Sequence, residues 1–318
     1  MKDNRLLSLC IPIYNRGAYL EKMLSRFLED KDLFDNKIEL IISDNCSEDD
    51  LKTIVDSYRR QGLNVTYFRQ ETNIGPDSNF LFCFEKANGK YCWLLGSDDI
   101  PVKGFLHYLI EQLNCNNDYG LVYLRLFQIN KWYRSVTSND VYSEVIMDNQ
   151  KMLCGINVWI TFMSSSIIRT EFIQSLDLTK YRGTSLIQVP LYVKSCLSSD
   201  LNLIINYNHC FEPDNDNASS GGYNFYKVFI VNLLSIMKEF VSDGLFTINS
   251  YNLFKKNEFK YYIIENSISS LVVGKDKIHK LDGAWRILWQ YYGKTPSTYF
   301  IMVDYFFKRL FSKLFLRR

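Results

Sequence analysis

The first hundred residues alternate between strand and helix patterns, and this alternation restricts the fold more than any other feature of the chain. Short apolar runs lie at 6–13, 38–44, 64–70 and 91–96, and segments with apolar residues at helical spacing separate them. Strand–helix–strand repetition predicts a mostly parallel sheet covered by helices. We therefore expect an α/β fold, in which a ligand binds beyond the carboxyl ends of the strands.

The rest of the chain is less regular and turns helical from Tyr223 onward. The polar, glycine-rich loop Asp214–Gly222 is the best boundary between these parts. The sequence therefore predicts a body at 1–218 and a helical C-terminal region at 219–318. Within the body we expect strands at 120–129, 143–148 and 202–212, a strand running into a helix at 160–176, and a helix at 186–197.

The net charge of +2 is distributed unevenly along the chain. Residues 275–318 hold ten Lys and Arg against three Asp and Glu, a net +7, whereas residues 1–274 have a net charge of −5. An acidic body with a basic tail argues against nucleic-acid binding. It favours a tail that meets an anionic surface.

The segment 303–318 predicts an amphipathic helix that lies in the inner leaflet of the cytoplasmic membrane. The alternative is a helix packed on the body with its basic face in water. The apolar side consists of Val303, Phe306, Phe307, Leu310, Phe311 and Leu314, and the basic side of Lys308, Arg309, Lys313 and Arg317.

Two further features predict a cytoplasmic protein that is peripheral to the membrane. No signal-peptide pattern is visible, and no run approaches the roughly 18 apolar residues of a transmembrane helix. The eight cysteines show no C-x-x-C spacing, which is typical of buried free thiols in a reducing compartment.

Polar side chains follow three of the predicted strands at the points where these strands end. They occupy Pro12–Arg16, Asp44–Ser47 and Ser97–Asp99. Because the carboxyl ends of parallel strands meet at one edge of a sheet, we expect these segments to form one site.

Asp98 and Asp99 are the most informative pair in that site. Gly96 and Pro101 break the strand, so both side chains can face one cleft from a turn. Two close carboxylates repel one another unless a cation or hydrogen-bond donors neutralise them, and a divalent metal on a diphosphate does so. The alternative is a turn whose Asp caps a helix beginning at Val102.

Several stretches resemble family 2 glycosyltransferases, which have the nucleotide-sugar-binding GT-A fold. The matching motifs are "LCIPIYNRGAYLEKML", "IELIISDNCSEDD", "NIGPDSNF" and "LLGSDD", in which Ser97 replaces the first acid of an Asp-x-Asp site. The chain also resembles the abequosyltransferase-like subgroup of O-antigen synthesis, with which it shares "GSDD" and the later "GTS" and "DND". The resemblance is strong over about 5–105 and weaker to about 217.

The resemblance implies a GT-A catalytic domain at 1–218, a nucleotide-diphosphate sugar as donor and Mg²⁺ or Mn²⁺ as cofactor. Its implied acceptor is a polyprenyl-linked oligosaccharide. Asp99 would bind the metal and Asp98 would serve catalysis. From their place in the sequence, Asp214 and Asp216 are further catalytic candidates, and His209 is a candidate third metal ligand or base, or else a structural residue of its strand. The implied nucleotide-sugar-binding residues are Pro12, Tyr14, Asn15, Arg16, Asp44, Asn73, Gly75, Asp77, Asn79, Ser97 and Asp98.

Some positions have alternative interpretations. Asp77 and Asn79 suit a helix start as well as a ligand contact, and the S-x-x-D spacing from Ser47 to Asp50 predicts a capping box. Gln188 stands where the family's acidic pair supplies the base, and a glutamine cannot be that base. This departure leaves room for a non-catalytic binding scaffold, and a nucleotidyltransferase is a further alternative on a related fold.

Overall fold

A computed structural model of the chain describes residues 5–115, 117–125, 141–207, 210–212, 223–268, 282–294 and 298. The chain divides into two compact units. The first comprises Met1–Met152 and Trp159–Asn217, and the second comprises Leu153–Val158 and Ala218–Arg318. The return of Leu153–Val158 to the second unit is not visible in the sequence pattern, because α6 (Asn149–Ile156) runs through the division without a break.

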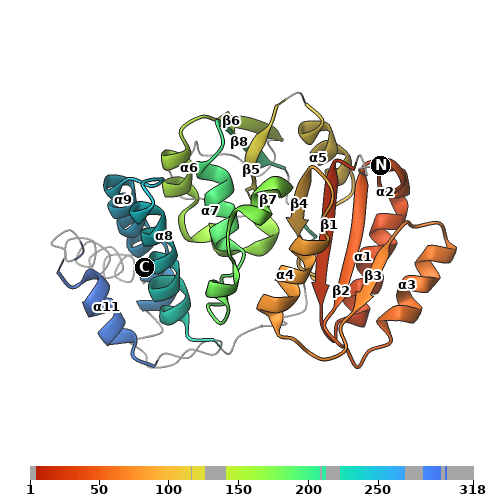
Figure 1. Cartoon of the computed structure of the whole chain (residues 1–318), viewed down its shortest axis with the longest axis horizontal. Coiled ribbons are helices and arrows are strands. Elements are labelled where there is room, and N and C mark those ends of the chain that lie inside the picture. Colours follow the sequence, from red (N-terminus) through yellow and green to blue (C-terminus); the bar gives the residue numbers. More distant parts are fainter. Residues whose placement is uncertain are drawn as a thin grey trace, which may run out of the picture. The chain divides into compact units, whose positions relative to one another are not determined.

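The described part of the first unit is built on an eight-stranded sheet with the order β3-β2-β1-β4-β7-β5-β8-β6 (Figure 1). The pairs β3–β2, β2–β1, β1–β4 and β5–β8 are parallel. Strand β7 is antiparallel to both β4 and β5, and β6 is antiparallel to β8. The predicted α/β class with a mostly parallel sheet is confirmed. The strands are β1 (Leu7–Ile13), β2 (Ile38–Asp44), β3 (Thr66–Arg69), β4 (Tyr91–Leu94), β5 (Tyr119–Leu124), β6 (Tyr142–Ile146), β7 (Ser166–Arg169) and β8 (Leu201–Asn206).

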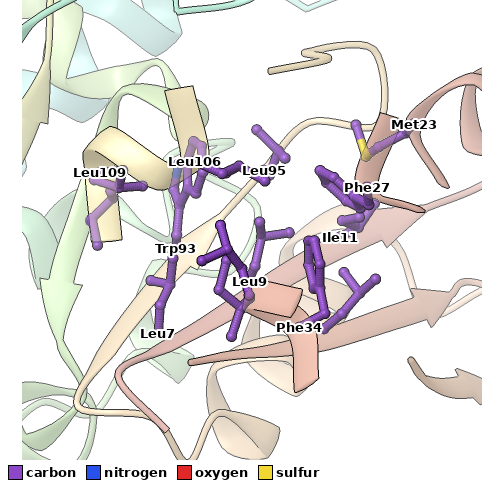
Figure 2. Close-up of a cluster of buried hydrophobic side chains, with 14 of the residues drawn as sticks. Leu7, Leu9, Ile11, Met23, Phe27, Phe34, Trp93, Leu95, Leu106 and Leu109 are labelled. Atoms are coloured by element: carbon purple, nitrogen blue, oxygen red, sulfur yellow. The ribbon is translucent and has the colours of Figure 1, made fainter. Parts of the chain in front are cut away.

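Helices cover both faces of this sheet, so its central strands are apolar on both sides. On β1, Leu9 and Ile11 pack into a core with Phe27 and Phe34, whose ring centroids are 4.9 Å apart (Figure 2). On the opposite face, the Cys10 thiol contacts the carbonyl of Cys83. The helices are α1 (Gly17–Glu29), α2 (Lys31–Asn36), α3 (Leu51–Arg60), α4 (Pro76–Lys86), α5 (Phe105–Leu113), α6 and α7 (Val189–Leu197).

The segment 160–176 differs from the prediction of a strand that runs into a helix. Only Ser166–Arg169 forms a strand, and short 3₁₀ turns lie on both sides, at Met163–Ser165 and Thr170–Ser175. Serine hydroxyls compete for backbone groups and favour turns, as the 2.7 Å bond from Ser165 Oγ to the Phe162 carbonyl illustrates.

The described part of the second unit is helical. It contains a π-helix (Lys227–Asn232), α8 (Leu233–Ser242), α9 (Ile248–Glu258), a second π-helix (Phe259–Ile268) and α11 (Ala284–Tyr292). Two amides fix the returning segment to α9: Asn157 donates to the Phe254 carbonyl at 2.8 Å, and Asn257 donates to the Cys154 carbonyl at 3.1 Å. Among the residues the structure describes, no helix has the length and apolar character needed to cross a membrane.

All eight cysteines are free. Six of them are buried, as expected for thiols in apolar runs, whereas Cys46 is partly exposed and Cys115 is exposed.

Candidate active site

The loops that follow β1, β2 and β4 meet at one edge of the sheet. The Asn15 amide donates to Ser47 Oγ at 2.9 Å, and the Glu48 amide donates to Asn15 Oδ1 at 2.7 Å. Arg16 Nη1 donates to Asp98 Oδ2 at 2.8 Å and so joins the first loop to the third. The predicted convergence of the three polar segments is confirmed.

The two adjacent acids lie in a tight turn over Gly96, as the sequence predicts. The Asp99 amide donates to the Gly96 carbonyl at 3.0 Å. A Cβ added to Gly96 would lie 2.5 Å from Asp99 Oδ2 and 3.1 Å from Asp98 Oδ1, so both carboxylates lie over the same side of this residue. The alternative of a helix beginning at Val102 is wrong, because α5 begins at Phe105 after Gly104, which lacks a capping side chain.

Ser164 connects this turn to the segment before β7. Its buried hydroxyl donates to Asp99 Oδ2 at 2.6 Å and accepts from the Gly96 amide at 2.8 Å, while its carbonyl accepts from Trp93 Nε1 at 2.9 Å. Sequence reasoning missed this residue. The only signal for it is the run of three serines from 164 to 166.

A divalent cation fits the chemistry of this turn. Carboxylate oxygens are the hard ligands that Mg²⁺ and Mn²⁺ prefer, and two of them share one side of a residue without a Cβ. Among the described residues, no three His, Cys, Asp or Glu side chains gather closely enough to hold a metal by themselves. The protein would therefore supply few ligands, as it does where a substrate phosphate supplies the rest.

Two contacts hold Arg16 at the carboxyl edge, the edge of the sheet where the carboxyl ends of the parallel strands lie. Its guanidinium pairs with Asp98 and lies 5.3 Å from the centre of the Tyr19 ring. The Arg16 and Asp98 side chains are 26% and 35% exposed, so both remain accessible to a ligand. That Arg16 reaches a phosphate stays a prediction.

Asp44 is buried and accepts hydrogen bonds from three donors. They are the Ser47 amide at 2.8 Å, the Tyr67 hydroxyl at 2.6 Å and Arg69 Nη1 at 3.1 Å. Burial and the hydrogen bond to Asp44 raise the pKa of Tyr67, so this hydroxyl stays a donor at neutral pH. In this structure Asp44 holds the loop after β2, and its predicted contact with the nucleotide base stays a prediction.

Asn45 fixes the turn that precedes α4. Its side-chain Nδ2 donates to Asn73 Oδ1 at 3.0 Å, and its Oδ1 accepts from the Ile74 backbone amide at 2.9 Å. The same Asn73 oxygen accepts from the amide of Gly75, whose φ of 80° is in the region that favours glycine. Asn73 and Gly75 thus lie beside the loop after β2, whereas sequence reasoning missed Asn45.

The side chains of Asp77 and Asn79 both form hydrogen bonds with other residues of the chain. The Asn79 side chain is 3% exposed and exchanges two hydrogen bonds with Ser43 at 2.6 and 3.0 Å, which joins α4 to β2. Asp77 Oδ2 accepts from the Gly183 amide at 2.6 Å, and the Ser185 amide also bonds this carboxylate. Burial raises the pKa of Asp77 even though these amides oppose the shift.

The predicted capping box after β2 is wrong. Asp50 caps α3, because its side chain accepts from the Thr53 amide at 3.1 Å. Ser47 instead accepts from Asn15, and Asp49 accepts from the Gly17 amide at 2.8 Å. These two side chains are recruited by the loop after β1, which lies far away in the sequence.

Gln188 precedes α7 and is 3% exposed. Its Nε2 donates to the Thr161 carbonyl at 2.9 Å, whereas its Oε1 has no hydrogen-bond partner among the residues that the structure describes. The side chain therefore presents an acceptor and no acid at the position where a base was expected.

The remaining predicted residues fall into two groups. Tyr14 is 43% exposed at the carboxyl edge, whereas Pro12 is buried within β1 and Ser97 is buried beside the acidic turn. His209, Asp214, Asp216 and the predicted helix at 303–318 lie outside the described residues.

The order of the strands and the acidic turn at their carboxyl edge define a GT-A fold, as predicted. Solved structures with the same fold include residues 1–349 of TarS from S. aureus in complex with UDP-GlcNAc. Its TM-score is 0.63 at 20% identity, over 90% of this chain and 80% of that one. Mannosyltransferase PcManGT from Pyrobaculum calidifontis, in complex with GDP-Man and Mn²⁺, has a TM-score of 0.50 at 12% identity, over 98% of this chain and 88% of that one.

The chain belongs to glycosyl transferase family 2, whose family model matches residues 8–176. It is 33% identical over 196 residues to abequosyltransferase RfbV of Salmonella typhimurium, covering 57% of this chain and 58% of the relative. It is 31% identical over 109 residues to the GalNAc(5)-diNAcBac-PP-undecaprenol beta-1,3-glucosyltransferase of Campylobacter jejuni, covering 34% of each. The chain thus spans between one third and three fifths of the length of these relatives.

Proposed function

We propose that the chain is a metal-dependent glycosyltransferase. It moves one hexosyl or deoxyhexosyl group from a nucleotide-diphosphate sugar to a hydroxyl of a polyprenyl-diphosphate-linked oligosaccharide, in the synthesis of an O-antigen or capsule-type polysaccharide. The observation that carries this proposal is the turn in which Asp98 and Asp99 share one side of Gly96 at the carboxyl edge of the sheet.

In this proposal Asp99 would hold a divalent cation, Mg²⁺ or Mn²⁺, whose positive charge would stabilise the departing nucleoside diphosphate. Ser164 holds the Asp99 carboxylate at a fixed position through its 2.6 Å hydrogen bond. Arg16, which now pairs with Asp98, would turn its guanidinium to the donor phosphate and free Asp98 for a sugar or ribose hydroxyl.

The donor base would lie against the exposed Tyr14 ring, between the loops that follow β1 and β2. The hydrogen bonds of Asn15, Asp44 and Asn73 described above hold these loops in place. The site thereby orients the anomeric carbon towards the acceptor and replaces a bimolecular encounter by positioning.

The proton of the acceptor hydroxyl needs a base other than Gln188. Asp214, Asp216 and His209 are the candidates that the sequence offers, and His209 is also a candidate metal ligand. A glutamine at position 188 would instead orient the hydroxyl of the acceptor sugar, because its Oε1 has no partner among the described residues and can accept a hydrogen bond.

The acceptor class and the membrane location are supported by the relatives and the sequence. The Campylobacter relative is named for an undecaprenol-diphosphate-linked acceptor. The basic, aromatic segment 303–318 suits the inner leaflet of the cytoplasmic membrane, where such an acceptor would be met. We propose a catalytic domain at 1–218, a C-terminal region at 219–318 and a peripheral position on the cytoplasmic face.

A test of the reaction uses the purified full chain with UDP-, GDP-, CDP- and dTDP-sugars. We expect one of these donors to be hydrolysed slowly in the presence of Mn²⁺, and we expect hydrolysis to be lost in Asp99→Ala. Asp56→Ala is the matched control, because Asp56 is a partly exposed carboxylate on α3 that pairs with Lys52 away from the site. If wild type and both variants bind nucleotide and none of them hydrolyses the donor, the non-catalytic scaffold is favoured. Release of pyrophosphate from a nucleoside triphosphate and a sugar phosphate would favour the nucleotidyltransferase.

A further inference from the structure

Two tryptophans on α11 are mostly exposed to solvent although they lie directly beside the buried face of the helix. Trp285 is 57% exposed and Trp289 is 65% exposed, whereas Ala284, Leu288 and Tyr292 are buried. Residues four apart lie on one side of a helix, so the two indoles form a continuous apolar stripe. A water-exposed helix face normally carries polar side chains at these positions.

The stripe is flanked by cations. Arg286 and Lys294 are exposed, and α11 itself has no Asp or Glu. The Trp289 ring lies over Gly293, because a Cβ at that glycine would come within 2.7 Å of the indole. The Trp289 indole is therefore held along the end of the helix.

We infer that this stripe, defined as Trp285 and Trp289 with Arg286 and Lys294, is a contact surface for an anionic lipid bilayer. Tryptophan has an apolar body and one N–H donor, which suits the interface between headgroups and acyl chains. Arginine and lysine beside it can reach the negatively charged headgroups. The charge of the chain's last 44 residues, a net +7, complements such a surface and does not complement a second copy of the same stripe.

This inference adds the stripe on α11 to the membrane contact proposed for the segment 303–318. It rests on the proposed membrane location and does not depend on the transferase reaction. The segment 295–318 contains no tryptophan, so a tryptophan signal separates contact by α11 from contact by the tail.

The test uses the full chain and vesicles of phosphatidylglycerol and phosphatidylcholine, with and without brominated acyl chains that quench indole fluorescence on contact. We expect wild type to bind the anionic vesicles and to be quenched by the brominated ones. Trp285→Phe/Trp289→Phe should keep most of the binding and lose that quenching. Trp285→Ala/Trp289→Ala should bind about tenfold more weakly for each indole removed.

The contribution of charge is tested by Arg286→Gln. This variant should bind anionic vesicles about fivefold more weakly than wild type and should bind pure phosphatidylcholine vesicles as wild type does. Met147→Ala is the control, because Met147 is 77% exposed and lies outside α11. Its binding and quenching should equal those of wild type.

Three results would overturn the inference: no binding of wild type to anionic vesicles, full quenching in the double Phe variant, or wild-type dimers that the double Ala variant breaks without any change in lipid binding. Donor hydrolysis in solution is measured on the same proteins and should be equal in all of them. Its absence from wild type would count against the transferase and would leave the lipid result standing.

Discussion

Replacing Ser164 with alanine tests how the acidic turn is held. The hydroxyl is the hydrogen-bond donor to Asp99 Oδ2 and the acceptor for the Gly96 amide, so one atom serves two partners. A hydrogen bond to a charged group is worth roughly 1.5–3 kcal/mol, and a buried amide left without a partner costs roughly 1–3 kcal/mol. Because the partly exposed carboxylate can recover some bonding from water, we expect the free energy of unfolding to fall by about 3 kcal/mol.

The more specific effect is on the metal. Without Ser164 the Asp99 carboxylate can rotate away from the position it shares with Asp98, and loss of such a supporting hydrogen bond weakens metal binding by roughly 10- to 100-fold. Mn²⁺ affinity is measured by titration calorimetry in the presence of the nucleoside diphosphate, and stability is measured by urea unfolding.

Ser165→Ala is the matched control, since Ser165 is equally buried but bonds the Phe162 carbonyl at 2.7 Å. It should lose about 1 kcal/mol of stability and keep its Mn²⁺ affinity. The reasoning is refuted if Ser164→Ala binds Mn²⁺ as tightly as wild type, or if both variants lose Mn²⁺ affinity equally.

Two further predictions concern carboxyl groups away from that turn. Burial raises the pKa of Glu258 well above its ordinary value of about 4.5, although the Tyr292 hydroxyl and the charge of Lys255 oppose the shift. The folded chain therefore keeps this proton while the unfolded chain loses it, and stability should fall as the pH rises above about 4.5, by up to about 1.4 kcal/mol per pH unit until the raised pKa is reached. Urea unfolding at several pH values gives the change in the free energy of unfolding per pH unit. This change should be smaller in Glu258→Gln than in wild type, and an equal change would contradict the assignment. Asp77→Asn removes the negative charge that accepts from the Gly183 and Ser185 amides, so trypsin should cut after the exposed Arg182 about tenfold faster. Asp177→Asn, which weakens only the local bonds from the Thr179 amide and hydroxyl, should be cut at the wild-type rate.

Elements with a strong local pattern were predictable from the sequence. The run "IELIISD" predicts a strand at 38–44, and β2 covers Ile38–Asp44, because a strand buried on both faces is apolar along nearly its whole length. The acidic turn was predictable for a similar reason: Gly96 and Pro101 each lie two residues from the nearer of the two carboxylates whose direction they set.

The partners of the site residues were not predictable in this way. The spacing from Ser47 to Asp50 fits a capping box, yet Ser47 accepts from Asn15, 32 residues away. Asn79 has the position of a helix-start residue, yet it bonds Ser43 inside the structure. In both cases a local motif lost to a long-range partner that the folded loops bring closer.

The sequence by itself thus determined the alternation of elements, the carboxyl edge at which polar residues gather and the family to which the chain belongs. Tertiary structure alone decided that Ser164 holds Asp99 across 65 residues, that Asp44 is already bonded by three donors, and that Leu153–Val158 returns to the second unit. The physical reason is range: hydrophobic periodicity acts between neighbours along the chain, whereas a hydrogen-bond partner depends on which distant loops the packed core places within 3 Å of one another.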